Sequence, residues 1–326
     1  MYQILITGLG AGIRYCEDDL MALQDIGTVT VLQDLTREEL LQQAEHVDII
    51  MTDVTKIDRE VMERAKHLRL IVEHGVGYDN IDVACATERG IPVCNTPEVY
   101  TKQVAEMALT LLFACAKRLC PAAKAVAETA VWDSSPYDCQ NISGKTLGII
   151  GCGRIGSAFL KMMQSFDLRI LVDDPYVPAS QIRALGAEPV SLDLLLKQSD
   201  FISIHTPKTP ETIHLLSGRE FSLMKKGVIL VNTARGGIVD EQALAHALDT
   251  GIVSAAALDV LEHEPETAKS PVFRNQKVLL TPHMAWRSET SIANVKRQSM
   301  ANVRAFHEGH PIFVCNPEVL KHGKLS

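Results

Sequence analysis

The chain lacks the features that mark membrane, secreted and nucleic-acid-binding proteins. It contains no run of 18 apolar residues, so we expect no transmembrane helix. Its first residues include no cationic segment followed by a long apolar one, so we expect no secretory signal. Lys and Arg total 32 against 40 Asp and Glu, a formal net charge of −8, and no basic stripe occurs. These absences make binding to nucleic acid or to a membrane unexpected.

Paired cysteines are also missing. The eight cysteines are scattered, none forms a Cys-x-x-Cys pair, and no pair of histidines has the spacing of a zinc site. We therefore expect free thiols in a reducing cytoplasm, no bound metal and no catalytic cysteine.

No low-complexity segment, repeat or Pro- or Ser-rich linker interrupts the 326 residues. At roughly 150 residues per domain, this length suggests two domains. Hydrophobic residues make up 46% and charged residues 22%, which is typical of a globular protein.

Short apolar runs alternate with amphipathic stretches along the first third of the chain. Strands are expected at 3–7, 29–32, 47–52 and 70–72, with helices around 20–25, 37–45 and 60–66. Strands that alternate with helices are typical of a parallel sheet covered by helices.

A second set of alternating elements follows a long, mostly apolar helix expected at 104–118. We expect a strand at 146–150 and a helix at 157–165. A helix at 291–306 is expected to return to the first domain. The remaining strands of this second set are expected at 169–172, 201–205, 228–232, 255–258 and 278–280.

The strand expected at 146–150 runs into Gly151-Cys152-Gly153-Arg154-Ile155-Gly156, which fits the dinucleotide-binding pattern G-x-G-x-x-G. The first glycine permits a tight turn, the second lets the backbone approach a pyrophosphate, and the third lets the helix pack on the strand. The next strand ends at Asp173-Asp174-Pro175, where an acid can accept hydrogen bonds from ribose hydroxyls and repel a 2′-phosphate. The pattern therefore favours NAD(H) over NADP(H).

Another glycine-rich turn, residues 8–12, also follows an expected strand. Ile13 stands where the dinucleotide pattern needs its last glycine. We therefore expect a turn without a nucleotide, although Asp34 after the next strand keeps the alternative open.

Polar residues follow three later strands, where ligands of parallel sheets bind. Arg235 lies in a glycine-rich loop, and its planar guanidinium suits a carboxylate, unless it is a surface arginine paired with Asp240. Glu262, His263 and Glu264 follow another strand. His283 follows the last one and titrates near neutral pH, which suits a general acid/base.

With these motifs in order, the chain resembles the D-isomer-specific 2-hydroxyacid dehydrogenases over about residues 1–320. The motifs that carry the resemblance are Gly75-Val76-Gly77-Tyr78-Asp79-Asn80-Ile81-Asp82, 144–156, His205-Thr206-Pro207, 232–240, 258–265, 281–285 and Asn316-Pro317-Glu318.

The resemblance implies a catalytic set of Arg235, Glu264 and His283. His283 would exchange a proton with the substrate C2 oxygen, Glu264 would orient it and raise its pKa, and Arg235 would bind the keto oxygen and carboxylate. Val76 and Gly77 would help to hold the carboxylate. Besides the three glycines of the loop, the implied NAD contacts are Arg154, Ile155, Asp174, Thr206, Ala234, Arg235, Asp259 and His283.

The implied fold consists of two doubly wound parallel-sheet α/β domains. A Rossmann NAD-binding domain, residues 98–287, is inserted in a discontinuous flavodoxin-like substrate domain, residues 1–97 and 288–326. Members of the family bind substrate between the domains and commonly dimerise through the NAD-binding domain, so we expect a homodimer.

Substrate choice depends on departures from the family pattern. Phosphoglycerate-specific members carry arginine where this chain has Thr52 and Glu73, and Glu73 would repel a phosphate, although Lys56 and His74 are nearby. The chain also has no length beyond Ser326 for an added regulatory domain. We expect a small unphosphorylated 2-oxo acid and its D-2-hydroxy acid.

Other readings of the same motifs stay open. They are 3-phosphoglycerate dehydrogenase, an NAD(H)-sensing interaction protein on the same fold, and phosphite oxidation. Formate oxidation is disfavoured, because those enzymes lack the glutamate. Trp286, after His283, either narrows the pocket or packs at the domain junction.

Overall fold

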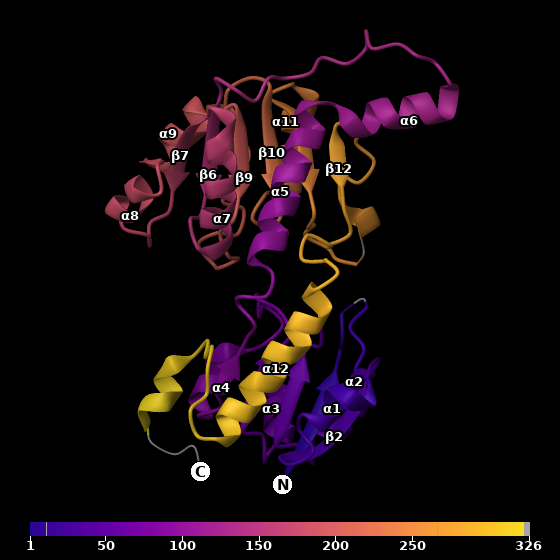
Figure 1. Ribbon diagram of the computed structural model, residues 1–326, viewed down its shortest axis with the longest axis vertical. Coiled ribbons are helices and arrows are strands. Elements are labelled where there is room, and N and C mark those ends of the chain that lie inside the picture. The colour runs from indigo at the N-terminus through magenta and orange to yellow at the C-terminus, as the bar shows by residue number, and fades with distance from the viewer. Residues whose placement is uncertain (11, 266, 323–326) are drawn as a thin grey trace. The chain divides into compact units, whose positions relative to one another are not determined.

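A computed structural model describes residues 1–10, 12–265 and 267–322 of the chain. Ala11 in the first glycine-rich turn and residues 323–326 of the predicted discontinuous domain lie outside the described residues. The chain forms two compact units, drawn in Figure 1. Unit 1 comprises Met1–Tyr100 and Arg287–Ser326, and unit 2 comprises Thr101–Trp286.

Unit 1 contains a five-stranded parallel sheet in the order β2-β1-β3-β4-β5. This is the doubly wound order of flavodoxin-like domains, as the family resemblance implies. The strands are β1 Tyr2–Thr7, β2 Gly27–Leu32, β3 Ile49–Thr52, β4 Leu70–Glu73 and β5 Val93–Cys94. The helices are α1 Glu17–Met21, α2 Arg37–Ala44, α3 Arg59–Arg64, α4 Val83–Glu88 and α12 Ser291–His307, with a 3₁₀ helix at Pro317–His322.

One row of apolar side chains crosses the middle of this sheet. Leu5, Ile50, Ile71 and Val93 are aligned in register on four neighbouring strands, and all are buried in one cluster. Continuous apolar strands are expected where helices cover both faces of a parallel sheet.

Unit 2 contains a seven-stranded parallel sheet in the order β12-β11-β10-β9-β6-β7-β8. Counted from β6, this is the Rossmann order with one further strand beyond β11. The strands are β6 Thr146–Ile150, β7 Arg169–Asp173, β8 Glu188–Pro189, β9 Phe201–Ile204, β10 Val228–Asn232, β11 Val253–Leu258 and β12 Val278–Leu280. The helices are α5 Thr101–Ala116, α6 Leu119–Thr129, α7 Arg154–Met163, α8 Ala179–Ala184, α9 Leu192–Gln198, α10 Gly218–Leu223 and α11 Glu241–Asp249, with 3₁₀ helices at Gln164–Phe166 and Thr267–Lys269.

Each face of this second sheet has its own core. Leu147, Phe201 and Ile229 are in register on one face and pack with residues of α5 and α7. Ile202 and Leu230 lie on the other face with residues of α9, α10 and α11. The sheet is therefore covered on both sides, as Figure 1 shows for the helices around it.

The strand order reverses between β6 and β9, which are hydrogen-bonded neighbours. The loops after these two strands consequently diverge to opposite sides of the sheet and leave a crevice at the carboxyl ends. The glycine loop follows β6, so the topology puts it at the place where doubly wound sheets bind ligands.

Three helices begin three residues earlier than the sequence pattern suggested, among them α5, which begins at Thr101 rather than 104. Helix α7 begins at Arg154 rather than 157, because Gly153 is its N-cap and the helix starts inside the glycine motif. Helix α1 spans Glu17–Met21 rather than 20–25, with three acids in its first turn, where the helix dipole favours negative charge. No helix within the described ranges is long and apolar enough to cross a membrane.

Candidate active site

The three glycines of the loop after β6 meet three different steric conditions. Gly151 has φ +89°, and a Cβ there would lie 2.7 Å from the amide nitrogen of Thr206. A Cβ on Gly156 would lie 2.1 Å from the carbonyl oxygen of Gly151. A Cβ on Gly153 would meet nothing within 4 Å. The first and third glycines are required by the fold, whereas the second faces open space that a ligand can approach.

Helix α7 starts directly at this open glycine. Arg154 and Ile155 are its first residues, and its N-cap, Gly153, offers no side chain to cap the first-turn N–H groups. Those N–H groups and the positive end of the helix dipole suit the phosphates of a dinucleotide. The loop therefore fits the pyrophosphate of NAD.

Asp174 is attached to the glycine loop. One carboxylate oxygen accepts the N–H of Cys152 at 2.7 Å, and the other accepts the N–H groups of Tyr176 at 2.8 Å and Val177 at 3.1 Å. Asp173 is half-buried at the end of β7, and burial together with the charge of Asp174 raises its pKa. The structure thus attaches Asp174, of the two acids, to the glycine loop.

The glycine-rich turn after β1 differs from this loop. A Cβ on Gly8 would lie 1.9 Å from Oγ1 of Thr55, and one on Gly10 would lie 2.0 Å from a carboxylate oxygen of Asp53. The next helix, α1, begins only at Glu17. The space beside Gly8 and Gly10 is filled by protein, including an acid, which is unsuited to a phosphate.

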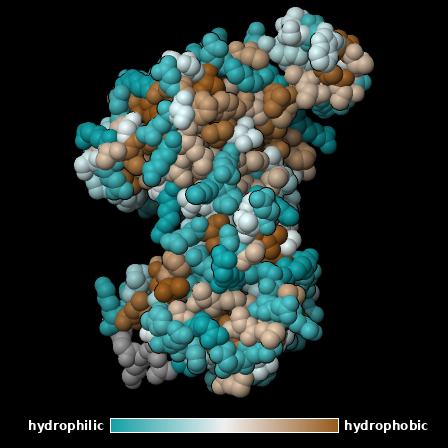
Figure 2. All heavy atoms as spheres, viewed as in Figure 1, coloured by the Kyte–Doolittle hydropathy of each residue, from teal (hydrophilic) through white to brown (hydrophobic). Residues whose placement is uncertain are grey.

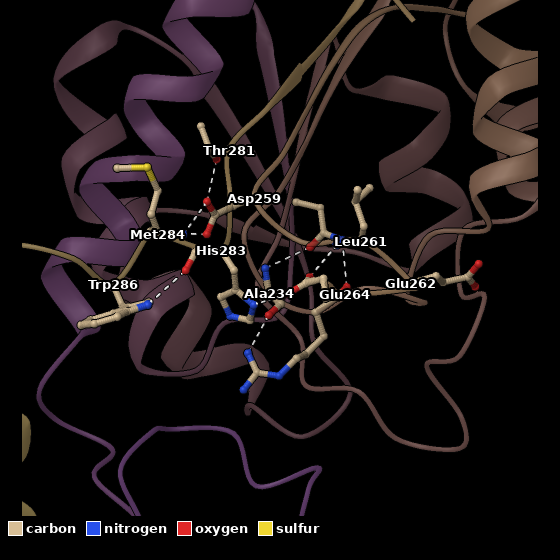
Figure 3. A network of polar contacts seen from close by, with 12 residues as sticks. Ala234, Asp259, Leu261, Glu262, Glu264, Thr281, His283, Met284 and Trp286 are labelled. Atoms are coloured by element: carbon tan, nitrogen blue, oxygen red, sulfur yellow. Dashed lines mark hydrogen bonds and ion pairs between the residues drawn. The ribbon is translucent and has the colours of Figure 1, made fainter. Parts of the chain in front are cut away.

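His283 and Glu264 form a direct pair at the carboxyl ends of the strands of unit 2. Nδ1 of His283 lies 2.7 Å from Oε2 of Glu264, and Oε1 of Glu264 accepts the N–H of Leu261 at 2.7 Å. Figure 3 shows the imidazole facing the carboxylate from the loop after β12. The His283 side chain is 44% exposed, so the pair can be reached from solvent.

The pair shifts the protonation of both groups. The hydrogen bond to Glu264 raises the pKa of His283 above its usual value, against the opposing effects of burial and of the Arg235 charge. Burial works to raise the pKa of Glu264, but the hydrogen bond and charge of His283 outweigh it and hold that pKa below its usual value. A protonated imidazole beside an ionised carboxylate is therefore favoured at higher pH than for a free histidine.

The backbone of His283 is held in an unusual conformation by its neighbours. His283 has φ +48°, a left-handed conformation that is uncommon for a residue with a side chain. Its N–H bonds to the carbonyl oxygens of Asp259 and Thr281 at 2.9 and 3.0 Å. The indole N–H of Trp286 donates to the His283 carbonyl at 3.1 Å. The surrounding loop therefore imposes the orientation of the imidazole.

Asp259 anchors that loop through its carboxylate. Oδ1 accepts the hydroxyl of Thr281 at 2.6 Å and the N–H of Met284 at 2.9 Å, and Oδ2 accepts the N–H of Ala285 at 2.8 Å. Asp259 is 1% exposed, and burial raises its pKa. Although the sequence predicts a cofactor contact here, this structure shows the carboxylate tying the end of β11 to the His283 loop (Figure 3).

Arg235 lies in the turn after β10. The side chain of Asn232 closes this turn by accepting the N–H of Ala234 at 3.0 Å and donating to the Arg235 carbonyl at 3.0 Å. Nη1 of Arg235 donates to the Ala234 carbonyl at 2.8 Å. Its positive charge acts on the pKa values of both Glu264 and His283, so the three predicted catalytic side chains share one electrostatic environment.

The Arg235 loop packs tightly on the loop that carries Glu264. A Cβ on Gly236 would lie 1.9 Å from the carbonyl oxygen of Leu261. Asp240, the alternative partner considered for Arg235, caps α11 by accepting the N–H of Ala243 at 3.1 Å and also accepts the Ser217 hydroxyl at 3.0 Å.

The predicted carboxylate-binding residues Val76 and Gly77 belong to unit 1, in the loop after β4. The Val76 carbonyl accepts the side-chain amide of Asn95 at 2.7 Å. Just before this loop, Thr52 and Glu73 are paired in register and fully buried. Glu73 accepts a hydrogen bond from Asn80 at 3.0 Å.

Sequence reasoning missed two groups that support the site. Asn232 was not singled out, although an Asn three residues before Arg235 is a signal for a side-chain-closed turn. Glu241, which bonds to the Glu264 loop, gave no signal, because its partner lies 21 residues later. In the described part of the chain, no group of three or more His, Cys, Asp or Glu side chains could hold a metal ion.

Comparisons with known proteins agree with this geometry. Residues 109–285 match the family model described as D-isomer specific 2-hydroxyacid dehydrogenase, NAD binding domain. The chain is 41% identical over 291 residues to D-3-phosphoglycerate dehydrogenase of Methanocaldococcus jannaschii, covering 89% of this chain and 54% of that protein. It is 38% identical to glyoxylate reductase of Korarchaeum cryptofilum, covering 88% of each chain.

The fold is shared with a solved structure of D-lactate dehydrogenase from Aquifex aeolicus, complexed with NAD and lactic acid. The TM-score is 0.86 at 28% identity, covering 98% of each chain. This chain spans about half the length of the phosphoglycerate dehydrogenases it matches, and most of the length of the glyoxylate reductase.

Proposed function

The chain belongs to the D-isomer-specific 2-hydroxyacid dehydrogenase family, and on that premise we propose that it interconverts a small 2-oxo acid and its D-2-hydroxy acid with NAD. The observation that carries this proposal is the 2.7 Å contact between Nδ1 of His283 and Oε2 of Glu264. The Glu264–His283 pair lies in loops that follow strands of the same sheet as the glycine loop, and the charge of Arg235 acts on both side chains. An oriented acid/base next to a carboxylate-binding cation suits chemistry at the C2 atom of a 2-oxo acid.

The cofactor would be held by the glycine loop, the start of α7 and Asp174. The open space at Gly153 supports the pyrophosphate position, and the acid at the end of β7 supports NAD(H) over NADP(H). Thr206, Ala234 and Asp259, at the ends of β9, β10 and β11, are the further proposed contacts. When bound, NADH supplies the hydride that the protein itself lacks.

The protein groups bind the substrate and move the proton. Arg235 would hold the substrate carboxylate and keto oxygen, with help from the backbone at Val76 and Gly77. Because Nδ1 of His283 is engaged with Glu264, Nε2 is the ring nitrogen that would give a proton to the C2 oxygen during reduction. In the oxidative direction the same nitrogen takes the proton back. Glu264 stabilises the imidazolium throughout.

We propose an unphosphorylated substrate. Glu73 is buried and ionisable at the position where phosphoglycerate-specific members carry arginine, and Thr52 beside it brings no positive charge. A phosphate dianion needs cationic partners in its site. The relatives point both ways, because one is a phosphoglycerate dehydrogenase and another a glyoxylate reductase. 3-Phosphoglycerate dehydrogenase therefore stays the main alternative, followed by an NAD(H)-sensing role.

We also propose a homodimer formed through the NAD-binding domain. Helix α6 has no buried residue, and it extends away from the sheet of unit 2 in Figure 1. Leu119, Val126, Val131 and Trp132 are exposed on and after it, and tan and brown apolar side chains cover much of it in Figure 2. Such exposed apolar surface is typical of an interface. A cytoplasmic location stays a prediction that rests on the scattered cysteines.

The test is NADH oxidation with a panel of glyoxylate, hydroxypyruvate, pyruvate, branched 2-oxo acids and phosphohydroxypyruvate. Each is assayed with the wild type and with His283→Ala, which we expect to lose about 10²–10⁴-fold in turnover while still binding NADH. His283-dependent turnover of one unphosphorylated acid would support the proposal. A preference for phosphohydroxypyruvate would favour the phosphoglycerate alternative. No turnover with NADH still bound would contradict the enzymatic role and favour sensing.

A further inference from the structure

Glu241 is a buried acid that the chemistry described above does not use. It is the first residue of α11 and is 4% exposed. Oε1 accepts the N–H of Glu262 at 2.7 Å. Oε2 is buried and has no hydrogen-bond partner within residues 1–10, 12–265 and 267–322. Burying a carboxylate with half of its hydrogen-bonding capacity unused costs stability, so its presence needs an explanation.

The partner of Glu241 belongs to the loop that carries Glu264. Glu262 is next to Leu261, whose N–H donates to Oε1 of Glu264 at 2.7 Å. The other oxygen of Glu264 meets His283. Two adjacent peptide units, those of Leu261 and Glu262, therefore connect the Glu241 carboxylate to the carboxylate that orients the imidazole.

Two other contacts of this loop hold its backbone less directly than the hydrogen bond from Glu262 to Glu241 does. On the outer side, the side chain of Glu262 pairs with Nε2 of His214, but these side chains are 25% and 45% exposed. Exposed pairs contribute little to holding a backbone in place. On the inner side, Gly236 packs closely against the Leu261 carbonyl. This packing limits the space of the loop but provides no hydrogen bond to it.

We propose that Glu241 is a positioning residue for the Glu264–His283 pair, acting through the N–H of Glu262. This inference rests on the proposed function of that pair. A carboxylate at the first turn of α11 is fixed by the helix, whereas the loop from 259 to 265 has no regular structure of its own. Glu241 thus ties the orientation of an irregular loop of the site to a helix.

The test measures the pKa of the His283 imidazole by NMR, with its signal assigned from the spectrum of a His283→Gln variant. The charged groups that act on this imidazole are Glu264, Arg235 and Asp259. Because Glu264 raises the His283 pKa, Glu241→Ala is expected to lower it by letting the carboxylate move away. The same variant is expected to lose about tenfold in kcat/KM, as for a displacement of less than about 1 Å.

Two further variants separate positioning from general stability. Glu241→Gln keeps an oxygen that can accept the Glu262 N–H, so we expect it to restore both the pKa and kcat/KM. Asp200 is a matched control, since its carboxylate also accepts a backbone N–H, that of Thr146 at 2.9 Å, but at the start of β6. We expect Asp200→Ala to lower Tm without moving the His283 pKa.

An unchanged His283 pKa in Glu241→Ala, with only a lower Tm, would overturn the proposal and leave a structural role. If Glu241→Ala does not fold, Glu241→Asp replaces it, because the shorter side chain moves the carboxylate away from the Glu262 N–H by one methylene. An unchanged His283 pKa in Glu241→Asp would equally overturn the proposal. The NMR titration needs no substrate. Failure of the proposed function would instead appear as a wild type that turns over no substrate in the panel.

Discussion

The imidazole of His283 and the carboxylate of Glu264 are 2.7 Å apart, although they come from different loops that follow different strands. The carboxylate is held on its other side by the N–H of Leu261 at the same distance. Glu264 therefore cannot rotate away from His283 without losing a backbone hydrogen bond. The orientation and protonation of the proposed acid/base are set by the fold before any substrate arrives.

Replacing Glu264 should move the pH profile of reduction. Reduction needs the protonated form of His283, so kcat/KM should be constant at low pH and fall as the pH rises through the raised His283 pKa. Glu264→Gln removes the main cause of that elevation, and the fall should then occur at lower pH. The measurement is kcat/KM for reduction between pH 5 and about 9 in both proteins. A fall at the same pH in both would show that Glu264 does not control His283.

Two glycines of one loop should behave in opposite ways. Gly156→Ala puts a methyl group 2.1 Å from a backbone oxygen and should destabilise the protein by about 1–3 kcal/mol. Gly153→Ala meets nothing within 4 Å and should change stability by about 0.5 kcal/mol or less, yet weaken NADH binding by about tenfold. Urea unfolding and fluorescence titration with NADH measure the two effects. Unchanged NADH affinity in Gly153→Ala would place the cofactor elsewhere.

Asp174→Asn should reduce discrimination between NADH and NADPH. The variant keeps one side-chain oxygen for part of these N–H groups, turns an amide N–H toward the others, and loses the charge that would repel a 2′-phosphate. We expect kcat/KM with NADH to fall by about tenfold, as for the loss of a charge-assisted hydrogen bond, and the value with NADPH to rise. Asp173→Asn, at the neighbouring acid, serves as the control. Equal changes in both variants would count against the special role of Asp174.

Asp259→Asn should loosen the His283 loop. The Asp259 carboxylate accepts three hydrogen bonds, from the Thr281 hydroxyl and from the N–H groups of Met284 and Ala285. The side-chain amide of Asn would point its own N–H groups at some of these donors and lose those hydrogen bonds. We expect a loss of about 1–3 kcal/mol in the free energy of unfolding, together with lower turnover. Thermal unfolding compared with His283→Ala checks this, since His283→Ala removes only the contact with Glu264 and should lower stability less. Wild-type stability in Asp259→Asn would show that the loop is held by other contacts.

Much of the architecture follows from local sequence patterns. The parallel α/β fold, the glycine loop and the strand-end positions of Arg235 and His283 were all predicted, because each depends on alternation or on a turn within a few residues. The two-residue strands β5 and β8 were not predicted, since they are too short to produce a periodic pattern.

The sequence by itself determined which chemical groups the protein has and at which ends of its strands they stand. Only the tertiary structure decided which of them touch: Asp174 accepts the N–H of Cys152, Asp259 accepts the N–H of Ala285 in the His283 loop, and Glu241 accepts the N–H of Glu262. The spacing of apolar residues that indicates a strand or a helix depends only on residues close together in the chain. Hydrogen bonds between loops depend on strand order and on the packing of side chains far apart in the chain, which no local pattern contains.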